Sequence, residues 1–234
     1  MKKQVDHQVK PYLPADVISE MLDILSKTYP SAESELNFTN PFECLIATML
    51  SAQCTDLRVN IITEQLFKEI QKPSDVVSLA EEALQNKIRS CNYYKTKSKN
   101  IMSTCQMLMD KYDGHVPPDR ELLMALPGVG RKTANVVLSN AFGVPAIAVD
   151  THVKRVANRL GIASATDPLE TEKQLMHVIP RERWSAAHHW LILHGRRICR
   201  ARTPLCMTCP LNHLCREFLM CQNSQKAAFT NKSD

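Results

Sequence analysis

A short segment in which a tight turn leads directly into a helix limits what this chain can fold into. The segment reads Leu126-Pro-Gly-Val-Gly-Arg-Lys-Thr-Ala134, and its apolar helical run continues to Phe142. Gly128 and Gly130 allow the backbone to approach another group closely, and the N–H groups of a helix N-terminus bind phosphate. Lys132 lies in the first turn of the predicted helix, and a neutral lysine amine is a nucleophile. The segment therefore combines a phosphate-binding turn with a candidate nucleophile.

A carboxylate follows this helix in the sequence. Asp150 lies in Ala148-Val-Asp-Thr-His152, directly before a predicted helix over residues 151–160. The ordinary role of an aspartate at this place is to cap the helix. If it faced a sugar, it would also stabilise developing positive charge, help to activate Lys132 or move protons. We predict that Asp150 is both a cap and a catalytic residue.

Four of the nine cysteines lie close together near the C-terminal end of the sequence. They form the pattern Cys199-x6-Cys206-x2-Cys209-x5-Cys215, whereas the other five are scattered. No apolar signal-peptide core follows the first residues, which predicts an intracellular protein. Disulfide frameworks are rare in that reducing environment, so we do not expect one here. Four thiolates this close together predict a metal site, which could hold zinc or a 4Fe–4S cluster.

The pattern of apolar residues predicts an all-α protein. Glycines number only 6, long alternating β-branched runs are missing, and Asn40-Pro41 starts a run with apolar residues at helical spacing. Asn40 and Thr55 are expected to cap the helices that follow them. The tail beyond Cys221 is polar, so we expect it to be disordered. The expected helices cover approximately residues 14–29, 40–51, 55–70, 73–90 in short pieces, 95–112, 120–125, 133–142, 151–160, a segment from 169 and 183–198.

Charge and hydropathy exclude some classes of protein. The net charge of +5 permits binding to nucleic acid without requiring it. No apolar run is long enough to cross a bilayer, which predicts a soluble intracellular protein with no membrane partner. The short tails favour a prokaryotic source.

Taken together, the segment 126–134, Lys132, Asp150 and the four cysteines resemble the helix-hairpin-helix DNA repair glycosylases of the endonuclease III family. The likeness extends from about Ser31 to Cys215. It implies two helical domains with a DNA-binding cleft between them and a C-terminal 4Fe–4S cluster loop. The implied domains are a six-helix barrel domain over 34–144, with the helix-hairpin-helix at about 119–142, and an iron–sulfur domain made of 1–33 plus 145–234. The spacing of the cysteines matches the family's iron–sulfur loop, so the resemblance favours a 4Fe–4S cofactor over zinc.

The resemblance also implies a reaction. The enzyme would be a bifunctional glycosylase that removes oxidised pyrimidines, such as thymine glycol, from duplex DNA. Lys132 would attack C1′ of the sugar, displace the base and form a Schiff base, after which β-elimination would cut the strand. The partner would be double-stranded DNA with a damaged base or an abasic site, bound by a monomer in the cytoplasm of a prokaryote, on the nucleoid.

Five further residues are candidates for contacts with DNA. A base must leave the duplex to reach Lys132, and another group must fill the gap. Gln53 resembles the family residue that enters this gap, and Tyr93 lies where the family often has an apolar wedge. Asp56 is a candidate for the base pocket. Arg200 and Arg202, on the loop after the first cysteine of the pattern, are suited to bind phosphate oxygens.

Several other functions compete with this interpretation. A non-catalytic helix-hairpin-helix protein would bind DNA but would have no need of Lys132 together with Asp150. The adenine-removing glycosylases of the same superfamily lack the lysine and usually carry an extra C-terminal domain. The glycosylases for oxidised purines keep the lysine but commonly lack the cysteine loop. An electron carrier would explain the cysteines and leave the hairpin unexplained.

Overall fold

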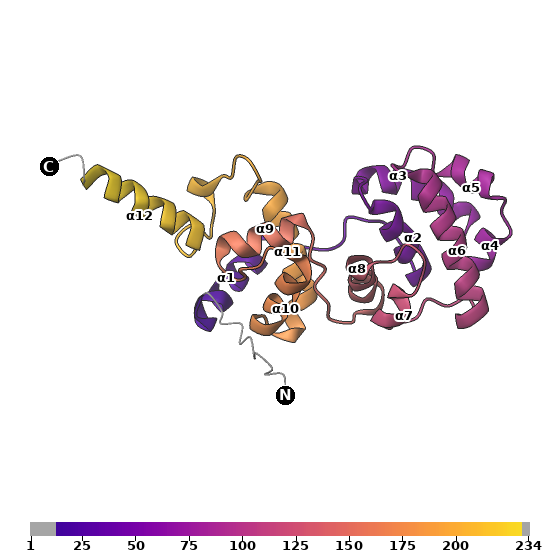
Figure 1. Ribbon diagram of the computed structural model, residues 1–234, viewed down its shortest axis with the longest axis horizontal. Helices are drawn as coiled ribbons and strands as arrows, with labels where there is room; N and C mark the ends of the chain where they lie inside the picture. Colours follow the sequence, from indigo (N-terminus) through magenta and orange to yellow (C-terminus); the bar gives the residue numbers. More distant parts are fainter. Residues whose placement is uncertain (1–12, 231–234) are drawn as a thin grey trace, which may run out of the picture. The chain divides into compact units, whose positions relative to one another are not determined.

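The structure, a computed structural model, describes residues 13–230, with side chains up to residue 224, and within this range it contains helices and no strand. The prediction of an all-α protein is therefore confirmed. Within the same range, no helix combines the length and apolar character that a membrane span requires. The chain divides into two compact units (Figure 1). We call Glu33–Ala148 the central unit, and the segments up to Ala32 and from Val149 onward the flanking unit.

The central unit is built from helices of very different lengths. The longest is α6 (Tyr94–Tyr112), and the most buried is α2 (Pro41–Ser51). The remaining elements are α3 (Asp56–Glu69), α4 (Pro73–Val77), α5 (Glu81–Lys87), α7 (Arg120–Met124) and α8 (Arg131–Phe142). The short helices α4 and α5 both pack against α6, and α7 packs against α8.

Helix α2 forms the core of the central unit. As predicted, Asn40 caps it: the Asn40 side chain accepts a hydrogen bond of 3.0 Å from the backbone N–H of Glu43. The sequence indicated one buried stripe, but every residue from 42 to 50 is buried, including Glu43 and Thr48. The buried surface is wider than a stripe because α3, α6 and α8 all pack against α2. A helix that is covered on several sides needs apolar residues around most of its circumference.

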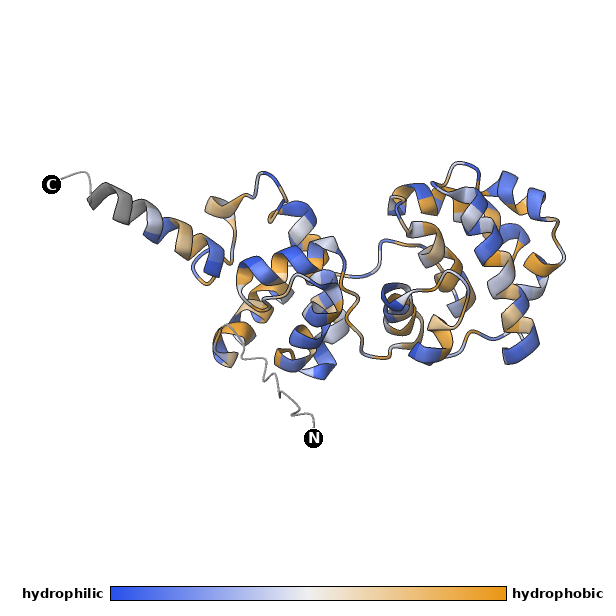
Figure 2. Ribbon diagram, in the orientation of Figure 1, coloured by the Kyte–Doolittle hydropathy of each residue, from blue (hydrophilic) through white to orange (hydrophobic). Residues whose placement is uncertain are grey.

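The flanking unit is organised around α11 (Trp184–Arg197), which packs against both α1 (Ala15–Thr28) and α9 (Thr151–Leu160). A side-chain contact also joins α11 to Tyr29, the residue that follows α1. The Tyr29 hydroxyl lies 3.1 Å from Nδ1 of His194. The other elements are α10 (Pro168–Val178), η1 (Arg181–Arg183), η2 (Cys206–Thr208) and α12 (Arg216–Thr230). In both units most helices mix hydrophobic and hydrophilic residues, as expected for helices with one buried side (Figure 2).

The prediction of disorder beyond Cys221 is wrong. Helix α12 runs from Arg216 to Thr230, and only residues 231–234 at this end lie outside the described range. The helix continues directly from the cysteine loop, because the N–H of Leu219 donates to the carbonyl of Cys215 over 3.0 Å. Its sequence includes leucine, methionine, glutamine, lysine and alanine, which favour a helix even without much burial. It projects from the rest of its unit (Figure 1).

Candidate DNA-binding and catalytic site

The predicted hairpin is present in the central unit, where α7 and α8 are joined by residues 125–130. Its turn is closed by a hydrogen bond of 3.1 Å from the N–H of Val129 to the carbonyl of Leu126, and both of these side chains are buried. Helix α6 also holds the turn, because the Thr104 hydroxyl donates a hydrogen bond to the carbonyl of Pro127 over 2.8 Å. The hairpin is therefore attached to the core through its apolar residues and through α6.

The two glycines of the hairpin have different reasons to be glycine. Gly128 has φ +77°, and a Cβ atom there would lie 2.6 Å from Nδ2 of Asn100. Gly130 has an ordinary φ of −88°, and a Cβ atom there would have no neighbour within 4 Å. Turn geometry and the packing against α6 thus explain Gly128. Gly130 has the open space that the approach of an outside group needs, and contact of either glycine with DNA remains a prediction.

This difference predicts that the two alanine substitutions affect different properties, stability for Gly128 and DNA binding for Gly130. Gly128→Ala should lower the free energy of unfolding by roughly 2 kcal/mol or more, because it combines a left-handed φ with a steric clash. Gly130→Ala should cost at most about 1 kcal/mol, since alanine is only a poorer helix cap. Gly130→Ala should nevertheless weaken DNA binding. Urea denaturation and fluorescence anisotropy with a labelled duplex measure the two effects, and unchanged DNA affinity of Gly130→Ala would remove Gly130 from the interface.

Lys132 is exposed and is the second residue of α8. Gly130 is the N-cap of α8 and has no side chain with which to bond the N–H groups of the first turn. The inner side of α8 is held by Asn135, a fully buried residue that sequence reasoning missed. Asn135 accepts a hydrogen bond of 2.8 Å from Nε of Arg120 and donates one of 2.9 Å to the carbonyl of Ile147. The signal in the sequence was an amide on the predicted buried face of the helix, next to Ala134, Val137 and Leu138.

Asp150 caps α9 in the flanking unit, as predicted. Its Oδ1 atom accepts hydrogen bonds of 2.8 Å from the backbone N–H groups of both His152 and Val153. The side chain is half-buried. The cap fixes the orientation of the carboxylate at the start of the helix. A catalytic role for Asp150 remains a prediction.

Gln53 and Tyr93 occupy two neighbouring turns of the central unit. Both are exposed, and both adopt the left-handed backbone conformation, with φ of 55° and 58°. The Asn92 side chain joins the two turns, because its Nδ2 atom donates to the carbonyl of Gln53 over 2.7 Å. Left-handed residues other than glycine are uncommon and concentrate at functional sites. The structure thus brings these two predicted residues together, while Asp56 lies half-buried in the first turn of α3.

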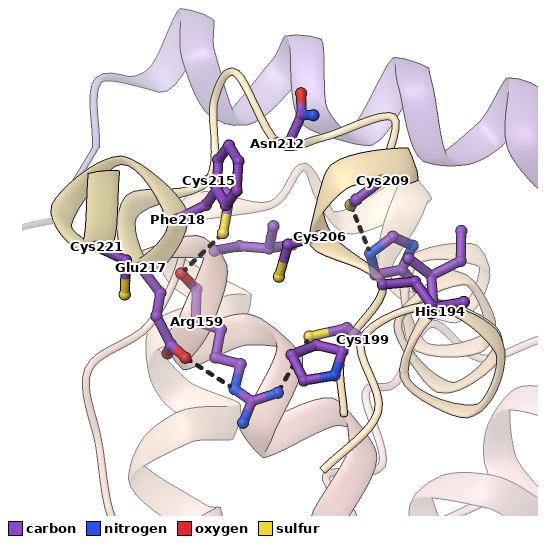
Figure 3. Close-up of a pocket in the computed structure, with 14 residues that line it drawn as sticks. Arg159, His194, Cys199, Cys206, Cys209, Asn212, Cys215, Glu217, Phe218 and Cys221 are labelled. Atoms are coloured by element: carbon purple, nitrogen blue, oxygen red, sulfur yellow. Dashed lines mark hydrogen bonds and ion pairs between the residues drawn. The ribbon is translucent and has the colours of Figure 1, made fainter. Parts of the chain in front are cut away.

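The four clustered cysteines line one cavity of about 170 Å³ in the flanking unit (Figure 3). Burial raises the pKa of the Cys209 thiol to about 11 and raises those of Cys206 and Cys215, so metal binding must displace protons. His194 lies 3.5 Å from the Cys209 sulfur, and burial lowers its pKa to about 4. The His194 ring is therefore neutral at pH 7.

The arrangement of these thiols bears on the choice between zinc and a cluster. Among the described residues, no three His, Cys, Asp or Glu side chains are close enough together to hold a single metal ion. The four thiols instead surround a shared space. A zinc ion needs all four sulfur atoms within about 2.3 Å of one point, whereas each iron of a 4Fe–4S cluster takes one thiolate. The residues present fit the cluster better than a single ion.

Two arginines of α9 hold the start of the cysteine loop, and sequence reasoning did not identify them. Arg159 donates hydrogen bonds to the carbonyls of Arg200 and Ala201 over 2.8 and 3.1 Å. It also pairs with Glu217 of α12. Arg155 donates to the carbonyl of Cys199 over 3.1 Å. Helix α9 therefore carries Asp150 at its N-terminus and supports the cysteine loop through its side chains.

This support leaves the side chains of Arg200 and Arg202 exposed on a loop with a fixed backbone. Arg202→Ala should weaken binding to all DNA sequences alike, because a guanidinium that contacts phosphate reads no base. The slope of log K against log salt concentration should fall by about 1. Anisotropy titrations at several salt concentrations measure this slope, with Arg181→Ala, an exposed arginine elsewhere in the unit, as the matched control. An unchanged slope would exclude Arg202 from the interface.

Comparison with known protein families identifies both parts of this arrangement. Residues 46–181 match the model of the HhH-GPD superfamily of base excision DNA repair proteins. Residues 199–215, which contain the four clustered cysteines, match the iron–sulfur binding domain of endonuclease III. The two matched regions include the hairpin, Lys132, Asp150 and the cysteine loop.

Individual relatives agree with the family models. Endonuclease III of Bacillus subtilis is 53% identical over 197 residues, which are 84% of this chain and 90% of the relative. Endonuclease III of Escherichia coli K12 is 47% identical over 196 residues, 84% of this chain and 93% of the relative. A trapped covalent intermediate of an endonuclease III with DNA is 53% identical, with a TM-score of 0.85, over 90% of this chain and 99% of that one. This chain belongs to the endonuclease III family of the HhH-GPD superfamily of base excision DNA repair proteins.

Proposed function

We propose that this chain is a bifunctional DNA glycosylase and abasic-site lyase that removes oxidised pyrimidines, of the thymine glycol type, from duplex DNA. The observation that carries the proposal is the place of Lys132, an exposed amine in the first turn of α8, directly after a hairpin suited to phosphate. A related endonuclease III, 53% identical to this chain, has been captured as a covalent intermediate with DNA. A nucleophilic amine at this position would account for such an intermediate here.

The hairpin would hold the DNA backbone. The N-terminus of α8 carries partial positive charge, and Gly130 lets a phosphate approach the backbone N–H groups without meeting a Cβ atom. Such contacts carry no base specificity and serve to position the strand. The result would be a sugar placed beside Lys132 once its base has left the stack.

Lys132 would then carry out the bond changes. Its Nζ atom attacks C1′, the bond from C1′ to the base breaks, and the base leaves with the bonding electron pair and takes up a proton. The sugar ring opens and the C1′–N bond becomes a Schiff base. Loss of a proton from C2′ expels the 3′ phosphate by β-elimination, and hydrolysis of the Schiff base restores the amine. Asp150 would stabilise the positive charge that develops on the sugar and take part in the proton transfers.

The two strained turns would keep the damaged nucleotide out of the duplex. Gln53 carries an amide that can hydrogen bond to the base left without its partner, and Tyr93 offers an exposed ring that can stack in the gap. Asp56, close to Gln53 in sequence, would line the pocket for the extruded base. The exposure of Gln53 and Tyr93, and the link between their turns through Asn92, support the roles of these two residues.

The cofactor is a 4Fe–4S cluster, as in the family whose iron–sulfur domain matches residues 199–215. We propose that Cys199, Cys206, Cys209 and Cys215 are its ligands, since these four thiols line the same cavity. When bound, the cluster supplies four strong bonds that tie the loop together. The loop in turn would present Arg200 and Arg202 to DNA phosphates. We place the enzyme in the cytoplasm of a bacterial cell, on the nucleoid, and expect it to act as a monomer.

Borohydride trapping on a panel of duplexes tests the proposed function. The panel contains thymine glycol opposite adenine, an abasic site, 8-oxoguanine opposite cytosine, and adenine opposite 8-oxoguanine. We expect a protein–DNA adduct on a denaturing gel with the first two duplexes only. An adduct that forms only with 8-oxoguanine would replace the substrate class by oxidised purines. Tight binding to these duplexes without any adduct would contradict the lyase assignment and indicate a binding protein.

A further inference from the structure

A buried lysine lies beneath the two strained turns of the central unit. Lys97 belongs to the first turn of α6, and only 7% of its surface is exposed. Its ammonium group donates hydrogen bonds to the carbonyls of Leu50 and Ala52, over 2.7 and 2.6 Å, and to the Cys91 sulfur over 3.2 Å. An ammonium group has three donors, and these three partners use all of them.

The partners explain why a cation is found at this place. Leu50 and Ala52 lie at the C-terminus of α2, where the last carbonyls of a helix lack intrahelical partners and carry partial negative charge. A buried charge is costly unless it is hydrogen bonded. Lys97 meets both needs at once, since the carbonyls receive donors and the ammonium group is stabilised by the end of the helix.

The same contacts determine the path of the two turns. Ala52 immediately precedes Gln53, and Cys91 comes two residues before Tyr93, so the ammonium group lies between the starts of both turns. The backbone of Lys97 itself closes the second turn, because its N–H donates to the carbonyl of Tyr93 over 3.0 Å. Residues other than glycine rarely adopt the left-handed conformation, and it persists only where the surroundings enforce it.

We infer that Lys97 is a positioning residue, which holds Gln53 and Tyr93 in the conformations needed to enter the gap left by an extruded base. The inference rests on the proposed function, because it assigns a purpose to the strain in these turns. Lys97 itself would touch neither the DNA nor the reacting atoms. Its effect would pass through Ala52 and Cys91 into the backbone of the two turns.

A comparison of two substrates separates positioning from a general loss of structure. The first substrate is a duplex with thymine glycol, which must be opened and its gap filled. The second is a single strand with an abasic site, which has no stack to open. Lys97→Met keeps most of the unbranched side chain and removes the ammonium group. In single-turnover assays it should lower base release from the duplex by about 10²-fold, the order expected for a misplaced group. Schiff-base trapping on the single strand should change less than about 2-fold, within the spread of surface substitutions.

Thr48→Val is the matched control, because Thr48 is a buried polar residue of α2 whose hydroxyl donates within its own helix, to the carbonyl of Cys44 over 2.6 Å. It should leave the ratio of the two activities unchanged. If Lys97→Met does not fold, Asn92→Ala takes its place. Asn92 is exposed, and its removal breaks only the side-chain link to the carbonyl of Gln53. Its effect should have the same direction and be smaller.

A double-mutant comparison identifies the route of the effect. In a Gln53→Ala/Tyr93→Ala background, Lys97→Met should cause little further loss of base release, because the residues through which it acts are already gone. Equal losses on both substrates, or a full additional loss in that background, would show that Lys97 has only a structural role. A wild-type protein that traps on neither substrate would instead overturn the proposed function, and the inference with it.

Discussion

Lys132→Gln should abolish the covalent chemistry of this enzyme. Glutamine keeps a polar side chain of similar length at an exposed helix position, so the fold should be preserved, but it has no amine to form a Schiff base. We expect no borohydride adduct and a fall in strand cleavage at an abasic site on the order of 10³-fold or more, as for other catalytic nucleophiles. Single-turnover assays with the variant in excess over labelled duplex measure this fall.

A matched variant shows whether the loss is specific to the position. Lys111→Gln removes another exposed ammonium group from the central unit, near the end of α6. It should reduce the net charge equally while leaving the trapping yield unchanged. The Lys132→Gln protein should still bind an abasic-site duplex, because the hairpin backbone remains intact. Retained adduct formation by Lys132→Gln would show that a different amine is the nucleophile.

Asp150→Asn should separate the two roles of this side chain. Asparagine caps a helix about as well as aspartate. The hydrogen bonds to the N–H groups of His152 and Val153 can therefore be kept while the negative charge is lost. We expect base release from thymine glycol duplexes to fall by about 10²- to 10⁴-fold, the range for groups that transfer protons or stabilise charge in the transition state. Thermal unfolding should change little.

Asp150→Ala serves as the comparison for stability. It removes the cap as well as the charge, so it should lower the free energy of unfolding by about 1 kcal/mol in addition to the loss of base release. If Asp150→Asn released bases at the wild-type rate while Asp150→Ala lost stability, capping would be the whole function of this residue. Measuring both variants by calorimetry and by single-turnover kinetics distinguishes these cases.

Local signals in the sequence were sufficient for most of the helices. The caps at Asn40, Thr55 and Asp150 all occur as predicted, because a side chain that bonds a neighbouring N–H group acts within three residues. The four cysteines were also recognisable from spacing alone, since they lie within 17 residues. The disordered tail was predicted wrongly because polar composition was given more weight than the helix propensity of α12.

Contacts between distant segments were beyond the reach of these signals. No local pattern in the sequence indicated that the Asn100 side chain packs beside Gly128. Only the structure separated the role of Gly128 from that of Gly130. The same holds for Arg155 and Arg159, which lie about 40 residues before the carbonyls that they bind. These residues looked like ordinary charged positions of a helix.

The sequence by itself determined the helical class, the hairpin with its lysine, the capping aspartate and the cysteine cluster. Each of these depends on residues close together along the chain, where backbone geometry and local hydrogen bonds decide the outcome. Only the tertiary structure brought the turns of Gln53 and Tyr93 side by side and placed the ammonium group of Lys97 beneath them. The physical reason is that a buried cation gains its stability from carbonyls that folding supplies, and these belong to another helix more than 40 residues away.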